Sequence, residues 1–524
     1  MPGWAHAAHS PSSPPVTGRS LLVAGTTSDA GKTVVTTGIC RALARRGISV
    51  APFKAQNMSN NSMVVEGGTA GECAEIGRAQ WIQAVAAGAR PEPAMNPVLL
   101  KPGSDRRSHV VVMGEPAGTL EAGEFAGGRR HLARAAFDAL DDLRSRYDVV
   151  VCEGAGSVAE INLRAHDYVN MGLARRAGMP TIVVGDIDRG GVFAAMAGTL
   201  ALLSPGDQEL VRGFVVNRFR GDVGLLRPGL DELERRTGRP VLGVLPWLRG
   251  LWLDSEDSLA LGARRSGDED DGGEADAAGA PTVAVVMLPR ISNFTDVDAL
   301  CLEPGVRVRY VDDPRALAGA DVVVLPGTRA TIGDLAWLRG RGLDTAIVEH
   351  AADGGAVLGI CGGFQMLGRE IRDPDGVEGS GGVAAPGLGL LDAVTEFGAG
   401  KVLRLPEGSA LGAAASGYEI HHGRVTVASG AEFLGGARDG LVFGTMWHGA
   451  LEGDALRSEW LREVARARGK SIATGAVGFA AARAERLDRL ADLIDEHMDV
   501  DALLAMLDGG PALPTVRLAL EQPR

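Results

Sequence analysis

The 524-residue sequence has little of what several protein classes require. Its five cysteines are scattered without a CxxC pair, which argues against a disulfide framework and a cysteine zinc site. No apolar run approaches the length of a membrane span. The Ala-, Ser- and Pro-rich start, residues 1–18, lacks the apolar core of a secretory signal. We therefore expect a cytoplasmic protein that does not contact a membrane.

Basic charge is also in deficit, since 53 Lys and Arg against 66 Asp and Glu leave a net charge of −13. That balance disfavours non-specific binding to nucleic acid, so we expect small molecules as partners and no nucleic acid. Hydrophobic residues make up 45% and charged residues 23%, as in globular proteins. The chain is too long for a single core, which predicts two or more domains. The oligomeric state is left open.

One shift in composition divides the chain. Residues 264–280 are acidic, rich in Gly and Ala and free of large apolar residues, and we interpret them as a solvated linker. On both sides, short β-branched runs alternate with longer helical stretches. The runs cover residues 21–25, 148–154, 181–186 and 213–217 before the linker, and 282–288, 306–311, 321–327 and 356–363 after it.

Continuous Val and Ile runs that end in Gly or Asp are typical of parallel strands buried on both faces. We therefore predict an α/β protein with two parallel-sheet domains, residues 19–263 and 281–455, after a disordered tail at 1–18. Residues 456–524 should be helical. Their apolar residues follow helical spacing, and we expect these helices to pack on the second domain. The residues that show this spacing are Leu487, Leu490, Ile494 and Met498.

A glycine-rich loop lies between the first apolar run and an amphipathic stretch. The tripeptide Gly31–Lys32–Thr33 is typical of a P-loop, where backbone N–H groups and a helix N-terminus cradle phosphates. Lys32 would reach the outer phosphates, and the Thr33 hydroxyl would hold Mg²⁺. The strict motif is broken at Thr26, with Gly25 one residue earlier. A purely structural turn is the alternative, which the strand–loop–helix context disfavours.

Three further polar residues would complete this nucleotide site. Glu153 ends an apolar run and is predicted to hold the metal, the alternative being a solvated carboxylate. Asp29 lies inside the loop and would orient a reacting group near the γ-phosphate. Asn217 ends another run and would contact adenine, although Asn also caps turns. We expect ATP and Mg²⁺, and no tightly bound prosthetic group.

A second site centres on GICGG, residues 359–363, between an apolar run and a helix-like stretch. This is the pattern of a nucleophile elbow, in which flanking glycines leave room for an exposed nucleophile. The helix N-terminus would favour the thiolate of Cys361, and His448, just past an apolar run, is the best placed imidazole. The N–H groups of Gly327 and Gly362 would form an oxyanion hole.

Other cysteines and histidines are interpreted as structural. Cys40, Cys152 and Cys301 are predicted to be inert buried side chains. His421 and His422 are adjacent, but they lack acidic or cysteine neighbours, and we do not expect them to bind a metal.

Longer motifs carry a family resemblance. They resemble the cobyric acid synthases, the glutamine-dependent amidotransferases of cobalamin biosynthesis, from about Arg19 into the C-terminal helices. The first domain resembles dethiobiotin synthetase-like P-loop proteins and the second resembles class I glutamine amidotransferases. The motifs are PFKAQNMSNNS, EIGRAQW, MNPVLLKP, EGAGSVAEINL, DIDRGGVFA, VVNRFRGD, RISNFTDVDAL, GICGGFQMLG and YEIHHG.

This resemblance implies a reaction that composition does not reveal. The b, d, e and g carboxylates of adenosylcobyrinic acid a,c-diamide would be phosphorylated by ATP and amidated with ammonia from glutamine, giving adenosylcobyric acid. Loops of the first domain would meet the corrin. Their polar candidates are Lys54, Gln56, Asn57, Asn60 and Arg189. The alternatives are that Lys54 binds phosphate and that Arg189 pairs with a carboxylate of its own loop, Asp186 or Asp188.

Two positions depart from the family pattern. Ala74 stands where we expect a glycine, and Ala450 stands where class I domains carry a glutamate two residues after the catalytic histidine. The group that orients His448 is therefore left open, with Glu452 as one substitute.

Three other functions are alternatives. A cobyrinic acid a,c-diamide synthase would use the same chemistry on other carboxylates, but NMSNNS and RISNFTDVD favour cobyric acid synthase by resemblance. A P-loop ATPase switch of the partitioning type and a regulator with a dead glutaminase would not need an ammonia source. The pair of Cys361 and His448 speaks against both.

Overall fold

The computed structural model describes residues 18–67, 72–102, 107–121, 129–248, 281–378, 382–475 and 478–517, and the structural statements below concern these residues. The predicted linker at 264–280 lies outside them, as does the predicted tail apart from Gly18. Within the described ranges, no helix is long and apolar enough to cross a membrane.

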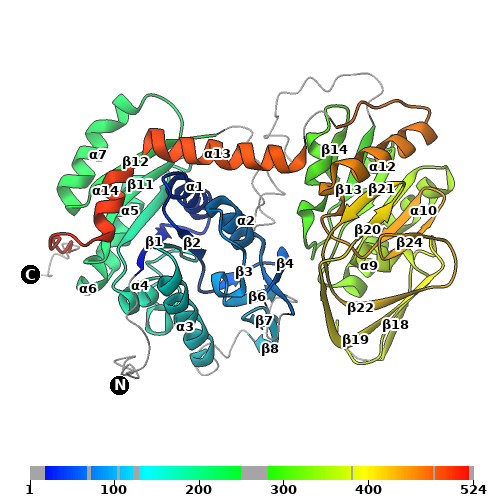
Figure 1. The fold of residues 1–524 in the computed structure, drawn as a ribbon, viewed down its shortest axis with the longest axis horizontal. Helices are drawn as coiled ribbons and strands as arrows, with labels where there is room; N and C mark the ends of the chain where they lie inside the picture. Colours follow the sequence, from blue (N-terminus) through cyan, green and yellow to red (C-terminus); the bar gives the residue numbers. More distant parts are fainter. Residues whose placement is uncertain are drawn as a thin grey trace, which may run out of the picture.

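The first domain is built on a six-stranded parallel sheet of order β12-β11-β10-β1-β9-β2 (Figure 1). Four strands match predicted apolar runs, and β2 and β12 extend the sheet at its edges. Alternate residues of β1 point to opposite faces, because Leu22 and Ala24 belong to one buried cluster and Leu21 and Val23 to another. The strands are β1 (Arg19–Gly25), β2 (Val50–Phe53), β9 (Val149–Glu153), β10 (Thr181–Asp186), β11 (Val211–Phe219) and β12 (Val241–Pro246).

Helices cover both faces of this sheet, as a parallel sheet requires. They are α1 (Lys32–Arg45), α2 (Arg78–Ala87), α3 (Arg130–Arg146), α4 (Met171–Ala177), α5 (Val192–Leu202), α6 (Pro205–Gln208), α7 (Val223–Thr237) and the short turns η2 (Pro93–Met95) and η3 (Arg164–His166).

Smaller sheets extend the first domain toward the second (Figure 1). The hairpin of β4 (Ser62–Glu66) and β5 (Cys73–Gly77) contacts strands β22 and β19 of the second domain. Beside it stands a four-stranded sheet of β3 (Asn57–Met58), β6 (Val98–Pro102), β7 (Arg107–Val112) and β8 (Glu115–Glu121).

The second domain has a seven-stranded sheet of order β14-β13-β15-β16-β25-β24-β23, whose first five strands are parallel. All four runs predicted after the linker are strands of this sheet. The strands are β13 (Thr282–Val286), β14 (Arg307–Val311), β15 (Val322–Leu325), β16 (Ala356–Ile360), β23 (Ala431–Phe433), β24 (Gly436–Asp439) and β25 (Val442–Thr445).

Two small sheets and several helices surround it. The strands are β17 (Glu370–Asp373), β18 (Val383–Pro386), β19 (Ala393–Arg404), β20 (Glu407–Ala410), β21 (Ala413–Ser416) and β22 (Glu419–Val427). The helices are α9 (Thr331–Gly340), α10 (Leu343–Ala352), α11 (Gly362–Leu367) and the turns η4 (Phe294–Leu302), η5 (Pro314–Leu317) and η6 (Ala450–Glu452). The predicted α/β fold with two parallel-sheet domains and C-terminal helices is thus confirmed.

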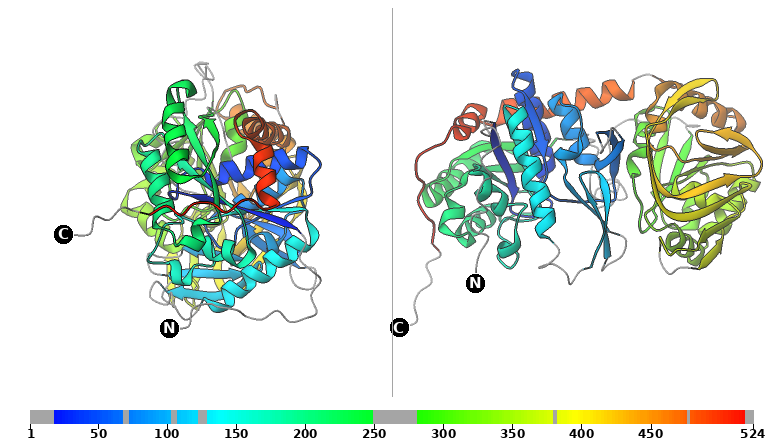
Figure 2. Two further views of the ribbon diagram at one scale, coloured as in Figure 1. Left: turned by 90° about the vertical axis from the view of Figure 1, so that its left-hand side faces the viewer. Right: turned by 60° about the horizontal axis from the view of Figure 1, so that its bottom comes forward.

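The docking of the C-terminal helices was predicted wrongly in part. Helix α12 (Asp454–Ala467) packs on the second domain, but α13 (Phe479–His497) crosses to the first domain and lies along α1 (Figures 1 and 2). Helix α14 (Val500–Leu507) follows it onto β1 and β12. The apolar spacing identified the buried face of α13 correctly. It could not identify which helix covers that face. The covering helix is α1, where Leu490 and Ile494 pack against Gly38.

Candidate active sites

The phosphate loop joins β1 to α1 through Gly31, which has a left-handed φ of 91° at the N-cap of α1. A Cβ atom at Gly31 would lie 2.0 Å from the side-chain nitrogen of Asn217. Glycine is therefore needed here for backbone conformation and for space. The side chain of Asn217 donates a hydrogen bond to the carbonyl of Ala30 at 3.0 Å, so it supports the loop from the end of β11.

The ammonium group of Lys32 is held by backbone carbonyls. Its Nζ donates to the oxygens of Thr27 at 2.8 Å, Ser28 at 3.0 Å and Gly156 at 3.0 Å, and the residue is 4% exposed. These three carbonyl oxygens accept the hydrogen bonds that Lys32 could donate to phosphate oxygens instead. The ammonium group is thus held at the loop by backbone oxygens that a phosphate could replace.

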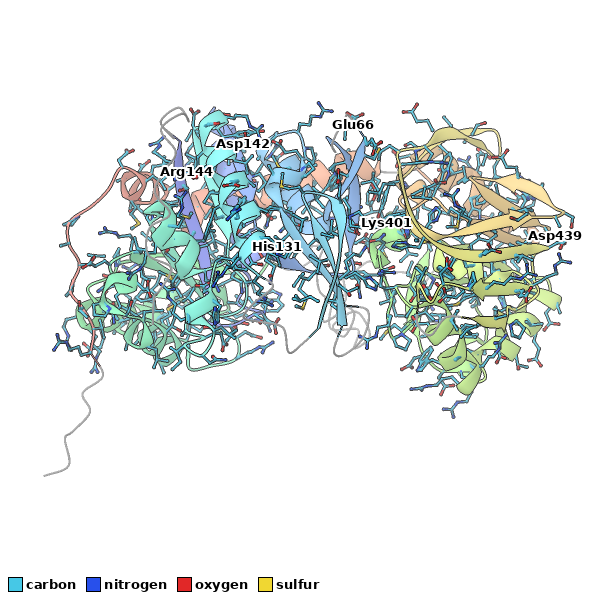
Figure 3. All side chains as sticks on the ribbon, turned by 90° about the horizontal axis from the view of Figure 1, so that it is seen from below. Glu66, His131, Asp142, Arg144, Lys401 and Asp439 are labelled. Carbon is cyan, nitrogen blue, oxygen red and sulfur yellow. The ribbon has the colours of Figure 1, made fainter. Side chains whose placement is uncertain are left out.

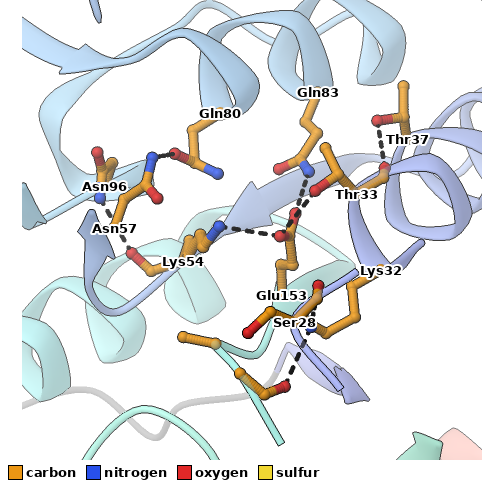
Figure 4. Close-up of polar contacts among 12 residues, drawn as sticks. Ser28, Lys32, Thr33, Thr37, Lys54, Asn57, Gln80, Gln83, Asn96 and Glu153 are labelled. Atoms are coloured by element: carbon orange, nitrogen blue, oxygen red, sulfur yellow. Dashed lines mark hydrogen bonds and ion pairs between the residues drawn. The ribbon is translucent and has the colours of Figure 1, made fainter. Parts of the chain in front are cut away.

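Glu153, at the end of β9, is the centre of a buried polar cluster (Figure 4). One carboxylate oxygen accepts from Thr33 Oγ1 at 3.0 Å and Lys54 Nζ at 2.9 Å, and the other accepts from Gln83 Nε2 at 2.6 Å. Burial would raise the pKa of Glu153, but the ammonium of Lys54 and the hydrogen bonds hold that pKa below its usual value. The carboxylate is therefore ionised beside the Thr33 hydroxyl, a pair of oxygen ligands that suits Mg²⁺.

The other predicted residues of the first centre divide into two groups. Asp29 accepts from Arg189 at 2.9 Å, whereas Asp186, one of the two carboxylates predicted to pair with Arg189, lies 3.9 Å from it. Arg189 is therefore bonded to the phosphate loop through Asp29, and its side chain is largely exposed.

The predicted corrin contacts are more deeply placed. Asn57 donates to Gln80 Oε1 at 3.0 Å, and Gln56 accepts from the Tyr168 hydroxyl at 2.5 Å. The side-chain oxygen of Asn60 is buried, and within the described ranges it has no hydrogen-bond partner. The NMSNNS segment thus offers an amide that a ligand could satisfy.

The thiol of Cys361 stands at a sharp turn between β16 and α11. Its backbone has φ 51° and ψ −107°, a conformation that costs an ordinary residue free energy and is typical of a nucleophile elbow. The flanking glycines are required by space. A Cβ atom at Gly359 would lie 2.7 Å from the nitrogen of Phe364, and one at Gly363 would lie 1.9 Å from the oxygen of Leu325.

His448 lies just past β25, and Asp296 orients it. The Nδ1 atom of His448 is 2.7 Å from Asp296 Oδ2, and the other oxygen of Asp296 accepts from the N–H of Gly449 at 2.8 Å. Burial alone would lower the pKa of His448, but Asp296 and a hydrogen bond with the Cys361 side chain raise it to about 10. The ring of Tyr418 stacks on the imidazole with centroids 5.2 Å apart. The side chains of Cys361, His448 and Asp296 thus form a triad.

Sequence reasoning missed Asp296, and its substitute candidate was wrong. The carboxylate of Glu452 bonds to Arg78 and Arg483, not to His448. Asp296 comes instead from η4, far upstream, where the motif RISNFTDVDAL was the available signal. The same turn corrects a second prediction, since Cys301 at its end is exposed, whereas Cys40 and Cys152 are buried.

The loop after β15 covers the elbow. A Cβ atom at Gly327 would meet His448 Cε1 at 2.9 Å, and one at Gly362 would meet the nitrogen of Thr328 at 3.0 Å. The loop is fixed by a hydrogen bond from the N–H of Ser292 to the Gly327 oxygen at 2.8 Å. The two predicted oxyanion donors therefore belong to segments that lie against the triad, and their role stays a prediction.

A cavity opens beside Cys361 and reaches the first domain at Lys101. Three of its polar atoms are buried, and in the described part of the chain they have no hydrogen-bond partner: Gln365 Nε2, His421 Nε2 and His422 Nδ1. Burial lowers the pKa of His421 to about 4 and that of His422 to about 3, so both rings are neutral. The cavity is thus lined by unsatisfied neutral groups that a polar ligand could pair.

Where this cavity meets the first domain, a buried carboxylate holds two lysines. Glu75 of β5 pairs with Lys101 of β6 at 2.6 Å and with Lys401 of β19, which lies at the domain boundary (Figure 3). Burial would raise the pKa of Glu75, but the two ammonium groups hold it far below its usual value. Burial also lowers the pKa of Lys101 to about 8. The domains therefore share a charged, solvent-poor contact.

Comparisons with known proteins agree with this two-centre arrangement. Residues 21–259 match a CobQ/CobB/MinD/ParA nucleotide binding domain, and residues 282–456 match a CobB/CobQ-like glutamine amidotransferase domain. The chain is 66% identical to a cobyric acid synthase of Mycolicibacterium gilvum, covering 94% of this chain and 97% of that one. It is also 66% identical to a cobyric acid synthase of Mycobacterium ulcerans, covering 94% and 98%. A solved glutamine amidotransferase matches 35% of this chain and 97% of its own at 23% identity, with a TM-score of only 0.28.

Proposed function

Because this chain belongs to the cobyric acid synthase family, we propose that it amidates the b, d, e and g carboxylates of adenosylcobyrinic acid a,c-diamide to give adenosylcobyric acid. The nitrogen comes from glutamine and the free energy from ATP. One observation carries the proposal: a nucleophile triad and a phosphate loop lie in one chain, and the cavity beside Cys361 is also lined by Lys101 of the first domain.

In the second domain, the Cys361 thiolate attacks the carboxamide carbon of glutamine. His448 carries the proton that the leaving ammonia takes, and a glutamyl thioester remains on the sulfur. Water then hydrolyses the thioester to glutamate. Asp296 keeps the imidazole oriented and its positive charge stabilised. The amide oxygen becomes negatively charged in the transition state, and the N–H groups of Gly327 and Gly362 would stabilise it.

In the first domain, a corrin carboxylate attacks the γ-phosphorus of ATP, giving an acyl phosphate and ADP. Ammonia then attacks the acyl carbon, and phosphate leaves as the amide forms. Lys32 would exchange its carbonyl partners for phosphate oxygens. Thr33 and Glu153 would hold Mg²⁺, which when bound neutralises charge on the phosphates. Asp29 would orient a reacting group, and Asn217 would meet the adenine from the edge of β11.

Ammonia must travel between the centres unprotonated, because ammonium is not a nucleophile. The cavity that begins at Cys361 ends at Lys101 in the first domain, which supports a route through the domain contact. The corrin would lie on the first domain beside the NMSNNS segment. There Gln56, Asn57 and the unsatisfied Asn60 are its proposed polar contacts, with Lys54 and Arg189 bordering the phosphate site.

The test is amidation by the purified full chain. Cobyrinic acid a,c-diamide or, in a parallel reaction, cobyrinic acid is supplied with ATP, Mg²⁺ and either glutamine or ammonium, and mass spectrometry follows the corrin. The proposal expects stepwise gain of four amides with either nitrogen source. Amidation of cobyrinic acid alone would instead assign the a,c-diamide reaction. ATP hydrolysis without amidation of either corrin would favour a switch ATPase.

A further inference from the structure

The carboxylate of Glu452 joins three parts of the chain. Glu452 ends the turn η6, which directly follows the segment of His448. Its Oε1 accepts from Arg78 Nη2 at 2.8 Å, and its Oε2 accepts from Arg483 Nη2 at 2.9 Å. Arg78 is the first residue of α2, and Arg483 lies near the start of α13. Each oxygen of one carboxylate is therefore held by the beginning of a different helix.

This junction is largely closed to solvent. The side chains of Arg78, Arg483 and Glu452 are 1%, 12% and 20% exposed. Both guanidinium groups also lie over the ring of Trp81, at 4.9 Å and 5.0 Å from its centroid. Buried ion pairs depend on good geometry, because a partner that moves away leaves an uncompensated charge. A shift of α2 or α13 would therefore draw Glu452 with it.

Helix α2 leads from this junction to the phosphate site. Gln83 follows Arg78 by five residues, about 7.5 Å along the helix axis. Its side chain donates to Glu153 at 2.6 Å, and Gln80 of the same helix accepts from Asn57 (Figure 4). One rigid element thus contacts Glu452 at its start and the proposed metal-binding carboxylate about a turn and a half later.

Helix α13 provides a second connection. From Arg483 it runs along α1, the helix that begins with Lys32 (Figure 1). Leu490 and Ile494 pack on Gly38 of α1. Ion pairs follow the contact: Arg41–Asp488, Arg45–Asp492 and Arg46–Asp495.

On its other side, Glu452 is continuous with the triad. The turn η6 begins at Ala450, and the N–H of the preceding residue, Gly449, bonds to the same Asp296 that holds His448. Displacement of η6 would therefore change the geometry between Asp296 and His448. That geometry sets the imidazole for proton transfer to the leaving ammonia.

We propose that Glu452 is a positioning residue that couples glutamine hydrolysis to occupancy of the phosphate site, an inference that rests on the proposed function. Binding of nucleotide and corrin alters the contacts of Glu153 and Lys32. Helices α2 and α13 carry the change to Arg78 and Arg483, and Glu452 adjusts the His448 segment. Glutamine is then hydrolysed rapidly only when nucleotide and corrin are bound and an acyl phosphate can react with the ammonia.

The test compares Glu452→Gln with the unsubstituted chain. Glutamine hydrolysis is measured with and without ATP plus cobyrinic acid a,c-diamide, alongside ammonium-driven amidation. We expect ATP and corrin to stimulate hydrolysis by the unsubstituted chain about tenfold or more, and the variant by less than about twofold. Its glutamine consumed per amide formed should rise above one. The KM for glutamine and the ammonium-driven rate should stay unchanged.

Two further variants separate coupling from damage to the fold. Glu459→Gln removes a carboxylate of an exposed ion pair on α12 and should behave as the unsubstituted chain. Arg78→Lys keeps the charge and should retain part of the stimulation. Normal stimulation in Glu452→Gln, or parallel loss of hydrolysis and ammonium-driven amidation, would overturn the proposal. So would an unsubstituted chain that amidates but shows no stimulation, whereas failure of all amidation would refute the proposed function itself.

Discussion

Both reaction centres begin where a parallel strand passes to a helix through a residue of positive φ, but the two residues differ. At the phosphate loop the residue is Gly31, with φ 91°, and at the thiol it is Cys361, with φ 51°. The first centre is proposed to bind phosphates through backbone groups, which a residue without a side chain can supply. The second centre needs the sulfur at the apex and must hold a cysteine in a strained conformation.

The surrounding side chains follow the same division. Around Gly31, Lys32 and Glu153 are paired with groups of the protein itself, and substrates must replace some of these contacts. Around Cys361, His448 is already fixed by Asp296 and Tyr418. In the second centre the imidazole already has its protein partners, whereas in the first centre substrates would have to exchange contacts with Lys32 and Glu153.

The largest effect should come from Cys361→Ala. Without a thiolate no glutamyl thioester forms, and glutamine-dependent amidation should fall by at least about 1,000-fold. Ammonium-dependent amidation should be retained within about twofold, because the phosphate centre is untouched. Mass spectrometry of the corrin measures both. A parallel loss with ammonium would show that the two centres are not separable.

The converse substitution is Lys32→Met. Loss of the ammonium group should lower amidation by about 100- to 1,000-fold with either nitrogen source, because charge on the transferring phosphoryl group is no longer neutralised. Glutamine hydrolysis in the absence of ATP should be unaffected. Retained amidation from ammonium would exclude Lys32 from phosphoryl transfer.

A smaller effect is expected from Asp296→Asn, which tests whether Asp296 orients the imidazole of His448. Hydrolysis of glutamine should slow about 100-fold, since the imidazole loses its oriented partner. Asp296 helps to raise the pKa of His448 to about 10, so this pKa should fall in the variant. The imidazolium would then lose its proton at lower pH. The alkaline limb of the pH–rate profile should move toward neutrality, and an unmoved limb would contradict the assignment.

The smallest effect concerns the strained apex itself. Cys361→Gly should be more stable than Cys361→Ala by about 1 kcal/mol, because glycine adopts positive φ without strain. Gly31→Ala should act in the opposite sense and destabilise by about 1–3 kcal/mol, since the new methyl group also meets Asn217. Thermal unfolding of the three variants measures the contrast. Equal stability of the two Cys361 variants would show that the elbow stores no strain.

Local pattern was enough to predict four strands of each parallel sheet and the two glycine turns. The runs that became β1, β9 and β16 are buried on both faces, so nearly every residue in them is apolar and the pattern is unambiguous. The edge strand β2 was missed because its four residues include a proline and offer no periodicity.

Contacts between distant segments could not be predicted in the same way. Asp296 reaches His448 from 152 residues away, and nothing in the spacing of either segment specifies that approach. The partners of Glu452 are farther still, since its pair with Arg78 spans 374 residues. Sequence periodicity reports which face of an element is buried, and tertiary packing decides what buries it.

The crossing of α13 has a consequence for synthesis on the ribosome. The apolar surface of α1 at Gly38 is covered by Leu490 and Ile494, which are translated some 450 residues later. At a synthesis rate of about 5–20 residues per second, that surface stays uncovered for tens of seconds or more while the second domain is made. A chain truncated before Phe479 would therefore leave this face of α1 uncovered and would leave Glu452 without its partner Arg483. If the two domains were made as separate chains, α13 would be part of the second chain and would have to bind α1 of the first.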